Sequence, residues 1–173
     1  MNSRPQVSDL EIRATNYDTC LHIFKIQSYL SFVVQDMLKR MAEHDQSKLC
    51  SAESDYFAWY TSKLKEAAYG SDEYKEFLKA LKPALDHHYA NNSHHPEHYP
   101  NGVNGMNLFD VVEMLVDWVA SSHRTKNGDV YRSIELQQER FGLDDQLKQI
   151  LINTVDYMKA HGIQVVPVKE GLV

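Results

Sequence analysis

Residues that commonly bind metal ions recur along this chain of 173 residues. The candidate ligands, in chain order, are His22, His44, Asp45, His88, His94, His95 and Asp117. Neutral imidazoles combined with carboxylates suit iron, manganese, zinc or a similar divalent cation. The residue types therefore predict a site for one or two ions of Mn, Fe, Zn, Co or Ni, and they predict metal-assisted chemistry.

These ligands must be positioned by helices, because the hydrophobic pattern predicts an all-α protein. Ser8 and Glu11 have the spacing of a capping box, and apolar residues then recur every three or four positions up to Met41, just before His44. Further helices are predicted after Ser51 to near Gly70, from Ser71 through His88, over 108–124, after the turn 126–128 up to Gly142, and over 145–161. Pro83 predicts a kink or a late start of the third helix, and the tail from Ile163 is expected to be extended.

Composition excludes several classes of protein. The net charge is -6, and the Lys and Arg residues are scattered, which argues against binding of polymeric nucleic acid. No apolar run approaches the roughly 18 to 20 residues that a membrane span needs, and the first residues lack the pattern of a secretory signal. Cys20 and Cys50 have no CxxC spacing. We therefore expect a single soluble domain, residues 1–173, in the cytoplasm and without a membrane partner.

A loop rich in Asn, Gly, Pro and His is predicted over 91–107. It contains His94 and His95, which are predicted as ligands, with the alternative that they are polar loop residues packed on Tyr99. On the preceding helix, His88 shares a face with Leu85, whereas the neighbouring His87 points away. His88 is therefore the predicted ligand of that pair.

The apolar helix predicted over 108–124 carries Asp110, Glu113 and Asp117 on one face. Acids in an otherwise buried helix need a partner. Asp117 is the predicted metal ligand, and Glu113 is predicted to orient a ligand or to act as a base. The alternative for Asp110 and Glu113 is a salt bridge with Lys or Arg of a neighbouring helix.

The segment His44-Asp45-Gln46-Ser47-Lys48 resembles the HD-x-(G/S)-K signature of the HD-domain superfamily of metal-dependent phosphohydrolases. In that superfamily an earlier helix provides a His, the doublet provides His and Asp, and a later helix provides an Asp. His22, His44, Asp45 and Asp117 match these roles in order. The resemblance implies a single HD-like helical bundle with a motif core over 22–124 and C-terminal helices over 129–161.

One branch of this superfamily carries a further His on a middle helix and a His-His-Glu segment in the loop that follows. His88 and the segment 94–97 resemble these features, although Pro96 is inserted before the Glu. The branch also has an Arg soon after the last Asp, in the place of Arg124. The whole chain is also similar to an uncharacterised family of phage and bacterial proteins with HDxSKL and HHPEH motifs, which implies the fold but brings no known activity.

A metal role for His22 requires a break in the first helix. In one straight helix, His22 and His44 would lie about 33 Å apart and could not share an ion. The break is predicted around 27–31, where Ser28, Tyr29 and Ser31 weaken helix propensity. The alternative for His22 is a buried, hydrogen-bonded histidine.

The superfamily resemblance implies hydrolysis of a nucleotide or a related small phosphate ester by a metal-activated water. Asp45, Lys48, Glu113 and Arg124 are the predicted catalytic residues, with Lys48 and Arg124 binding phosphate oxygens. The expected partner is a small anionic substrate, and homo-oligomerisation is left open. The alternatives are a di-iron oxygenase with the HD fold and a binding module that retains this fold without being an enzyme.

Overall fold

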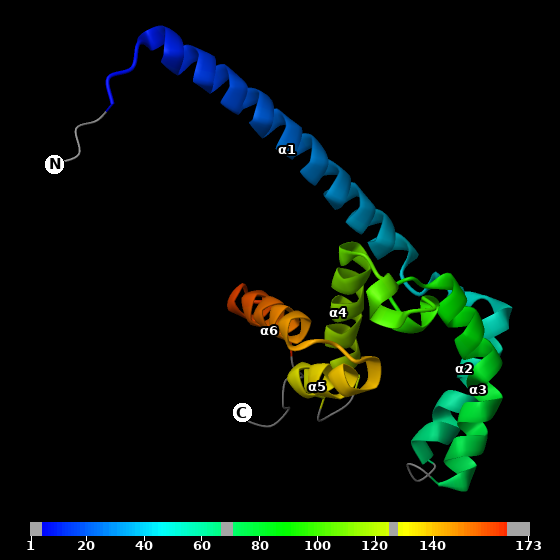
Figure 1. Cartoon of the computed structure of the whole chain (residues 1–173). Helices are drawn as coiled ribbons and strands as arrows, with labels where there is room; N and C mark the ends of the chain where they lie inside the picture. The colour runs from blue at the N-terminus through cyan, green and yellow to red at the C-terminus, as the bar shows by residue number, and fades with distance from the viewer. Residues whose placement is uncertain (1–4, 67–70, 125–127, 166–173) are drawn as a thin grey trace. The chain divides into compact units, whose positions relative to one another are not determined.

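The computed structural model describes residues 5–66, 71–124 and 128–165 (Figure 1). All regular elements in these residues are α-helices or short 3₁₀ helices, which confirms the predicted all-α class. The elements are α1 (Asp9–Glu43), η1 (Gln46–Leu49), α2 (Ser51–Glu66), α3 (Asp72–Asn91), η2 (Pro96–His98), η3 (Gly102–Gly105), α4 (Leu108–Ser122), α5 (Val130–Phe141) and α6 (Asp145–Ala160).

Backbone contacts divide the chain into two compact units, Met1–Glu43 and His44–Val173. The first unit contains α1, and the second contains all the other helices and the metal-type residues from His44 onward. Within the described residues, no helix combines the length and apolar character that a bilayer span requires.

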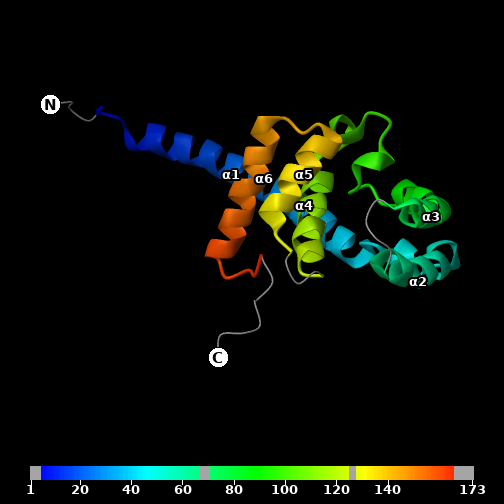
Figure 2. The same cartoon turned by 90° about the horizontal axis from the view of Figure 1, so that it is seen from below.

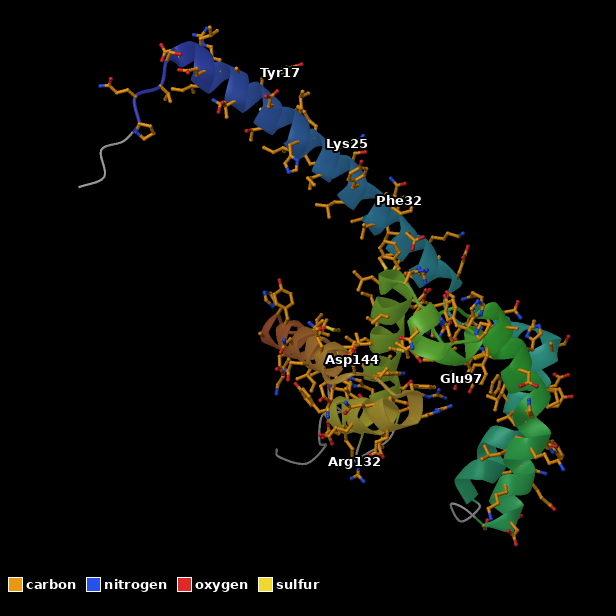
Figure 3. The ribbon with its side chains drawn as sticks, in the orientation of Figure 1. Tyr17, Lys25, Phe32, Glu97, Arg132 and Asp144 are labelled. Carbon is orange, nitrogen blue, oxygen red and sulfur yellow. The ribbon has the colours of Figure 1, made fainter. Side chains whose placement is uncertain are left out.

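Helix α1 begins with the predicted capping box. The backbone N–H of Ser8 donates to Oε2 of Glu11 at 2.8 Å, and the N–H of Glu11 donates to Oγ of Ser8 at 3.3 Å. The helix then continues without interruption for 35 residues, and its side chains project in all directions (Figure 3). The predicted break around 27–31 is therefore wrong. Ser and Tyr lower helix propensity by less than about 1 kcal/mol each, and without Gly or Pro they do not end a helix.

In the second unit, α2 and α3 lie side by side, and η1 contacts both of them (Figures 1 and 2). Helix α3 begins at Asp72 and contains Pro83, so a late start is wrong. The predicted end of the second helix near Gly70 and most of the predicted turn 126–128 lie outside the described residues. This helix pair positions Glu53 and His88 for the site described below.

Helices α4, α5 and α6 form the main hydrophobic core (Figure 2). One face of α4 contributes Met114 and Trp118, which pack with Ile134 of α5 and Val155 of α6. The boundaries follow local chemistry, because Asp129 and Asp144 cap α5 and α6, and Gly142 ends α5 in the left-handed region. The last described residues, 163–165, are not helical, and the rest of the predicted extended tail lies outside the described residues.

Asp110 anchors the histidine-containing loop to the start of α4. Its carboxylate is fully buried and accepts hydrogen bonds from Ser93 Oγ at 2.7 Å, Tyr99 Oη at 2.7 Å and the Asn107 backbone N–H at 2.9 Å. Ser93 and Tyr99 lie on either side of His94 and His95 in the chain. Asp110 therefore sets the path of the segment that carries both histidines.

We expect Asp110→Asn to destabilise the protein by about 2 kcal/mol, because an amide replaces one acceptor oxygen with a donor that faces other donors. Urea unfolding followed by circular dichroism measures this change. The control is Asp86→Asn, since Asp86 pairs with Lys82 on the exposed surface of α3. Equal unfolding midpoints for the two variants would contradict the assigned role of Asp110.

Candidate metal centre

Asp45 lies in a turn between His44 and η1, with a φ of 56° in the left-handed region. Among the described residues it is the one residue other than glycine with a positive φ. Asp tolerates this conformation better than most residues, but the geometry is uncommon and often occurs at functional sites. Lys48, in the next turn, forms an ion pair with Oδ2 of Asp45. The chain thus presents the Asp45 carboxylate from a fixed turn with a cation beside it.

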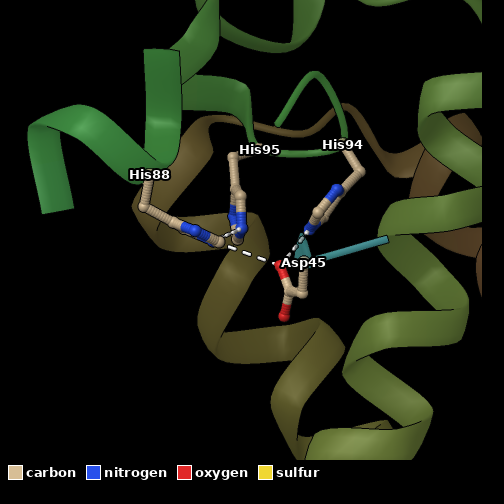
Figure 4. A group of neighbouring side chains, drawn as sticks. All are labelled: Asp45, His88, His94 and His95. Carbon is tan, nitrogen blue, oxygen red and sulfur yellow. Dashed lines mark hydrogen bonds and ion pairs between the residues drawn. The ribbon is translucent and has the colours of Figure 1, made fainter. Parts of the chain in front are cut away.

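Three imidazoles lie around the Asp45 carboxylate (Figure 4). Oδ1 of Asp45 lies 3.3 Å from Nε2 of His88 and 3.6 Å from Nε2 of His94, and His88 Nε2 lies 2.9 Å from His95 Nε2. We call these four residues the three-histidine group. His88 comes from α3, whereas His94 and His95 come from the loop that Asp110 anchors.

A second set of ligands shares Asp45. Nε2 of His44 lies 3.6 Å from Oδ2 of Asp45 and 3.7 Å from Oδ1 of Asp117, which α4 provides. We call His44, Asp45 and Asp117 the two-carboxylate group. The two groups thus share Asp45, and each uses a different oxygen of its carboxylate.

The separations and the unpaired atoms fit metal ligation. With bonds of about 2.1 Å, neighbouring ligand atoms are roughly 3.0 Å apart around an octahedral ion and roughly 3.4 Å apart around a tetrahedral one. Within the described part of the chain, Asp45 Oδ1 and His94 Nε2 are buried without a hydrogen bond. Such atoms are costly to bury unless a ligand satisfies them. The His/Asp cluster can therefore hold a metal ion.

Glu113 fixes the orientation of two of these imidazoles. Its Oε1 lies 2.9 Å from Nδ1 of His44 and 3.1 Å from Nδ1 of His94. A carboxylate only accepts hydrogen bonds, so both Nδ1 atoms carry a proton and the Nε2 atoms are the ones that can bind an ion, that of His44 once it has lost its own proton. Glu113 therefore contacts two of the predicted ligands, and its predicted role in orienting a ligand stays a prediction.

Glu53 orients the imidazole of His88 in the same way. The sequence did not single out this residue. This residue of α2 is fully buried, and its oxygens lie 2.9 Å from Nδ1 of His88 and 2.7 Å from Nδ1 of His87. His87, whose side chain is 39% exposed, is therefore also a partner of Glu53. A signal was present, because Glu53 lies one turn before Phe57 on the apolar face of its helix.

The charges of the centre perturb the pKa values of its histidines. Contact with Asp117 and then the hydrogen bond to Glu113 raise the pKa of His44 to about 10. Burial, followed by the nearby His94 and His88, lowers the pKa of His95 to about 3. At neutral pH the metal-free two-carboxylate group therefore holds a proton on His44, whereas His95 is neutral and ready to ligate.

The metal-free protein should lose stability as pH falls from about 6.5 towards 3. The unfolded chain protonates His95 below its ordinary pKa of about 6.5, whereas the folded protein resists protonation down to about 3. Burial lowers the pKa of His88 in the same direction, whereas the raised pKa of His44 leaves that residue protonated in both states across this window. Thermal unfolding at successive pH values measures the effect, and His95→Asn should reduce the loss. The lowered pKa values of Asp45, Glu53 and Asp117 cause a further loss towards pH 3 that remains in this variant. A flat profile for the unmodified chain would contradict the prediction.

A pocket of about 340 Å³ lies beside the centre, between the end of α3, the histidine loop, α4 and α5. His95 and Asp117 line it, so it borders both ligand groups. Its walls also include Glu97 and Arg140, which form an ion pair at 2.6 Å. The sequence analysis did not single out Arg140, because a cation on an amphipathic helix is ordinarily a surface residue.

The structure therefore brings together six of the predicted metal ligands: His44, Asp45, His88, His94, His95 and Asp117. His22 lies within the uninterrupted α1, about 31 Å along the helix from Glu43 at 1.5 Å per residue, so the break that would bring it to the site is missing. Lys48 forms an ion pair with Asp45, and its predicted role in binding phosphate oxygens stays a prediction. Arg124 is exposed after the end of α4 and is not among the residues that line the pocket, and its phosphate-binding role stays a prediction.

Comparison with known proteins places the chain in a family. Neither the curated proteins nor the solved structures gave a match. A model described as a family of unknown function, DUF5662, matches residues 11–157, a range that includes every ligand of both groups. This agrees with the predicted likeness to an uncharacterised family. Because the match spans most of the chain, the protein belongs to this family of unknown function, DUF5662.

Proposed function

We propose that this protein is a metal-dependent phosphohydrolase of the HD-domain type that acts on a nucleotide or a related small phosphate ester. The observation that carries the proposal is the shared carboxylate of Asp45, with one oxygen in the three-histidine group and the other in the two-carboxylate group. Two adjacent ions that share a carboxylate suit in-line displacement at phosphorus. The order of the ligands along the chain resembles the HD pattern, although His22 lies within the uninterrupted α1.

The ions would supply the main chemistry, and residues of the protein would balance charge and orient the ligands. When bound, the ions would lower the pKa of a water molecule and polarise the phosphoryl group. Lys48 would balance negative charge on the phosphate oxygens, since it pairs with Asp45 and its side chain is 36% exposed. Glu113 would act as a positioning residue rather than a base, because the imidazoles of His44 and His94 both point their Nδ1 atoms at its Oε1.

The experiment is metal analysis followed by an activity screen. Purified full-length protein is analysed for transition metals, stripped with a chelator, reloaded with Mn²⁺, and incubated with nucleotides and p-nitrophenyl phosphate. We expect metal-dependent release of phosphate that the chelator abolishes and Mn²⁺ restores. If the reloaded protein releases no phosphate from any of these esters, the proposal is wrong.

The two alternatives give different results in the same experiment. The mixed imidazole and carboxylate donors also suit iron, so a di-iron oxygenase would contain iron as isolated and would consume oxygen with a suitable reductant. A binding module would show no turnover, and substitution of His44 or His88 would change only its stability. Phosphate release with a redox-inert ion such as Zn²⁺ would exclude both alternatives.

A further inference from the structure

The pocket beside the metal centre has a wall from each ligand group, His95 from the three-histidine group and Asp117 from the two-carboxylate group. A molecule in this pocket therefore lies next to both candidate ion positions. We propose that the pocket binds the organic part of a phosphate monoester, an uncharged, ring-bearing group no larger than one nucleoside, and that the Glu97–Arg140 pair selects against a second phosphate. This inference rests on the proposed function.

The charge of the pocket limits how many phosphates a substrate can carry. Among the described residues that line it, Glu97, Asp117 and Arg140 carry a formal charge at neutral pH. Asp117 belongs to the metal centre, and Glu97 neutralises Arg140. Away from the ions the pocket therefore has no net charge. The ions can accommodate one phosphoryl group, but a second one would enter the pocket without a cation free to balance it.

Arg140 is held in place as well as neutralised. Its Nη2 donates to Oε1 of Glu97 at 2.6 Å, and its guanidinium lies 4.7 Å from the centre of the Phe141 ring. An Arg fixed in this way can donate its other N–H groups to a neutral oxygen or nitrogen of a ligand. A second phosphate would have to displace Glu97 or lie beside its carboxylate, and like charges in contact disfavour binding.

The other walls suit a ring with polar substituents. Trp118 and Phe141 provide aromatic surface, whereas Ser133 and Gln137 provide hydroxyl and amide groups. Gln137 makes no hydrogen bond with another described residue, so its amide is available to a ligand. A volume of about 340 Å³ lies at the lower end of the range for small-molecule sites, which limits the ligand to roughly one nucleoside.

The selection against a second phosphate is tested with full-length protein loaded with Mn²⁺. The substrates are the 5′-mono-, di- and triphosphates of adenosine, guanosine, cytidine and uridine. We expect kcat/KM for monophosphates to exceed that for di- and triphosphates by at least about tenfold, and Glu97→Gln to reduce this preference about tenfold because it releases the charge of Arg140. The control is Glu139→Gln, an exposed residue of α5 outside the pocket lining, which should leave the preference unchanged.

The size limit is tested with a matched pair of bulky substitutions on α5. Gln137→Trp fills the pocket, whereas Leu136→Trp adds the same side chain at a position that is 57% exposed and outside the lining. We expect Gln137→Trp to lower kcat/KM for a nucleoside monophosphate by about tenfold or more. It should affect the smaller p-nitrophenyl phosphate much less, and Leu136→Trp should affect neither substrate.

The outcomes separate this inference from the proposed function. A preference for triphosphates, an unchanged preference in Glu97→Gln, or equal effects of the two Trp variants would overturn the pocket assignment while hydrolysis stands. If no ester is hydrolysed, the proposed function is wrong. Calorimetric titration of the Mn²⁺-loaded protein with AMP and ADP then tests whether the pocket binds a nucleoside monophosphate. Tighter binding of AMP that Gln137→Trp weakens would support the assignment, and equal binding of both nucleotides would overturn it.

Discussion

Replacement of Asp45 by Asn should remove metal-dependent activity, with a fall in kcat/KM of roughly 10³-fold. The carboxylate contributes Oδ1 to the three-histidine group and Oδ2 to the two-carboxylate group. An amide has one oxygen and no charge, so it cannot serve both groups. Substitutions around metal ligands typically lower metal affinity 10 to 100-fold, and loss of a shared ligand should exceed that range.

Asn is a better choice than Ala for this test because Asp45 has a φ of 56°. Asn tolerates the left-handed region, whereas Ala would add backbone strain and could unfold the turn. Circular dichroism should therefore show an unchanged fold, and elemental analysis should show loss of metal. Asp86→Asn is the control, as an exposed acid on α3. Retention of full metal content and activity in Asp45→Asn would rule out the shared-ligand assignment.

Replacement of Glu53 by Gln should weaken metal binding by 10 to 100-fold, as expected for a residue that orients a ligand. Burial alone would raise the pKa of Glu53, but hydrogen bonds from His87 and Ser47 and the charge of His88 outweigh it and hold the pKa below its usual value. Glu53 is therefore a buried carboxylate that accepts from Nδ1 of His88 and leaves Nε2 facing Asp45. Gln keeps the size but presents a neutral amide, so the imidazole loses its charged partner.

The measurement is the dissociation constant of Mn²⁺, by calorimetry or competition with a chelating dye. Asp55→Asn is the matched control, because Asp55 lies on the exposed side of the same helix. A merely structural role for Glu53 would lower the melting temperature without changing metal affinity once the protein is folded. Unchanged affinity in folded Glu53→Gln would therefore contradict a positioning role.

Local chemistry accounts for the parts of the fold that were predicted correctly. The Ser8–Glu11 capping box and the end of a helix at Gly142 depend on residues within a few positions of one another. The break predicted in α1 is wrong because it was inferred from a distant ligand and not from the local sequence. It was placed there to bring His22 to the site, and the local sequence, without Gly or Pro, favours a continuous helix.

The sequence by itself determined the helical class and pointed to candidate ligands, because apolar spacing decides which segments form helices and residue types limit which ions can bind. Only the tertiary structure decided how these ligands divide into two groups around Asp45, and it gave Glu53, Glu113 and Arg140 their partners. The contacts of Glu53 with His88 and of Glu113 with His44 join residues 35 and 69 positions apart. Helix periodicity shows which face a side chain occupies, but the atom it meets depends on how separate helices pack.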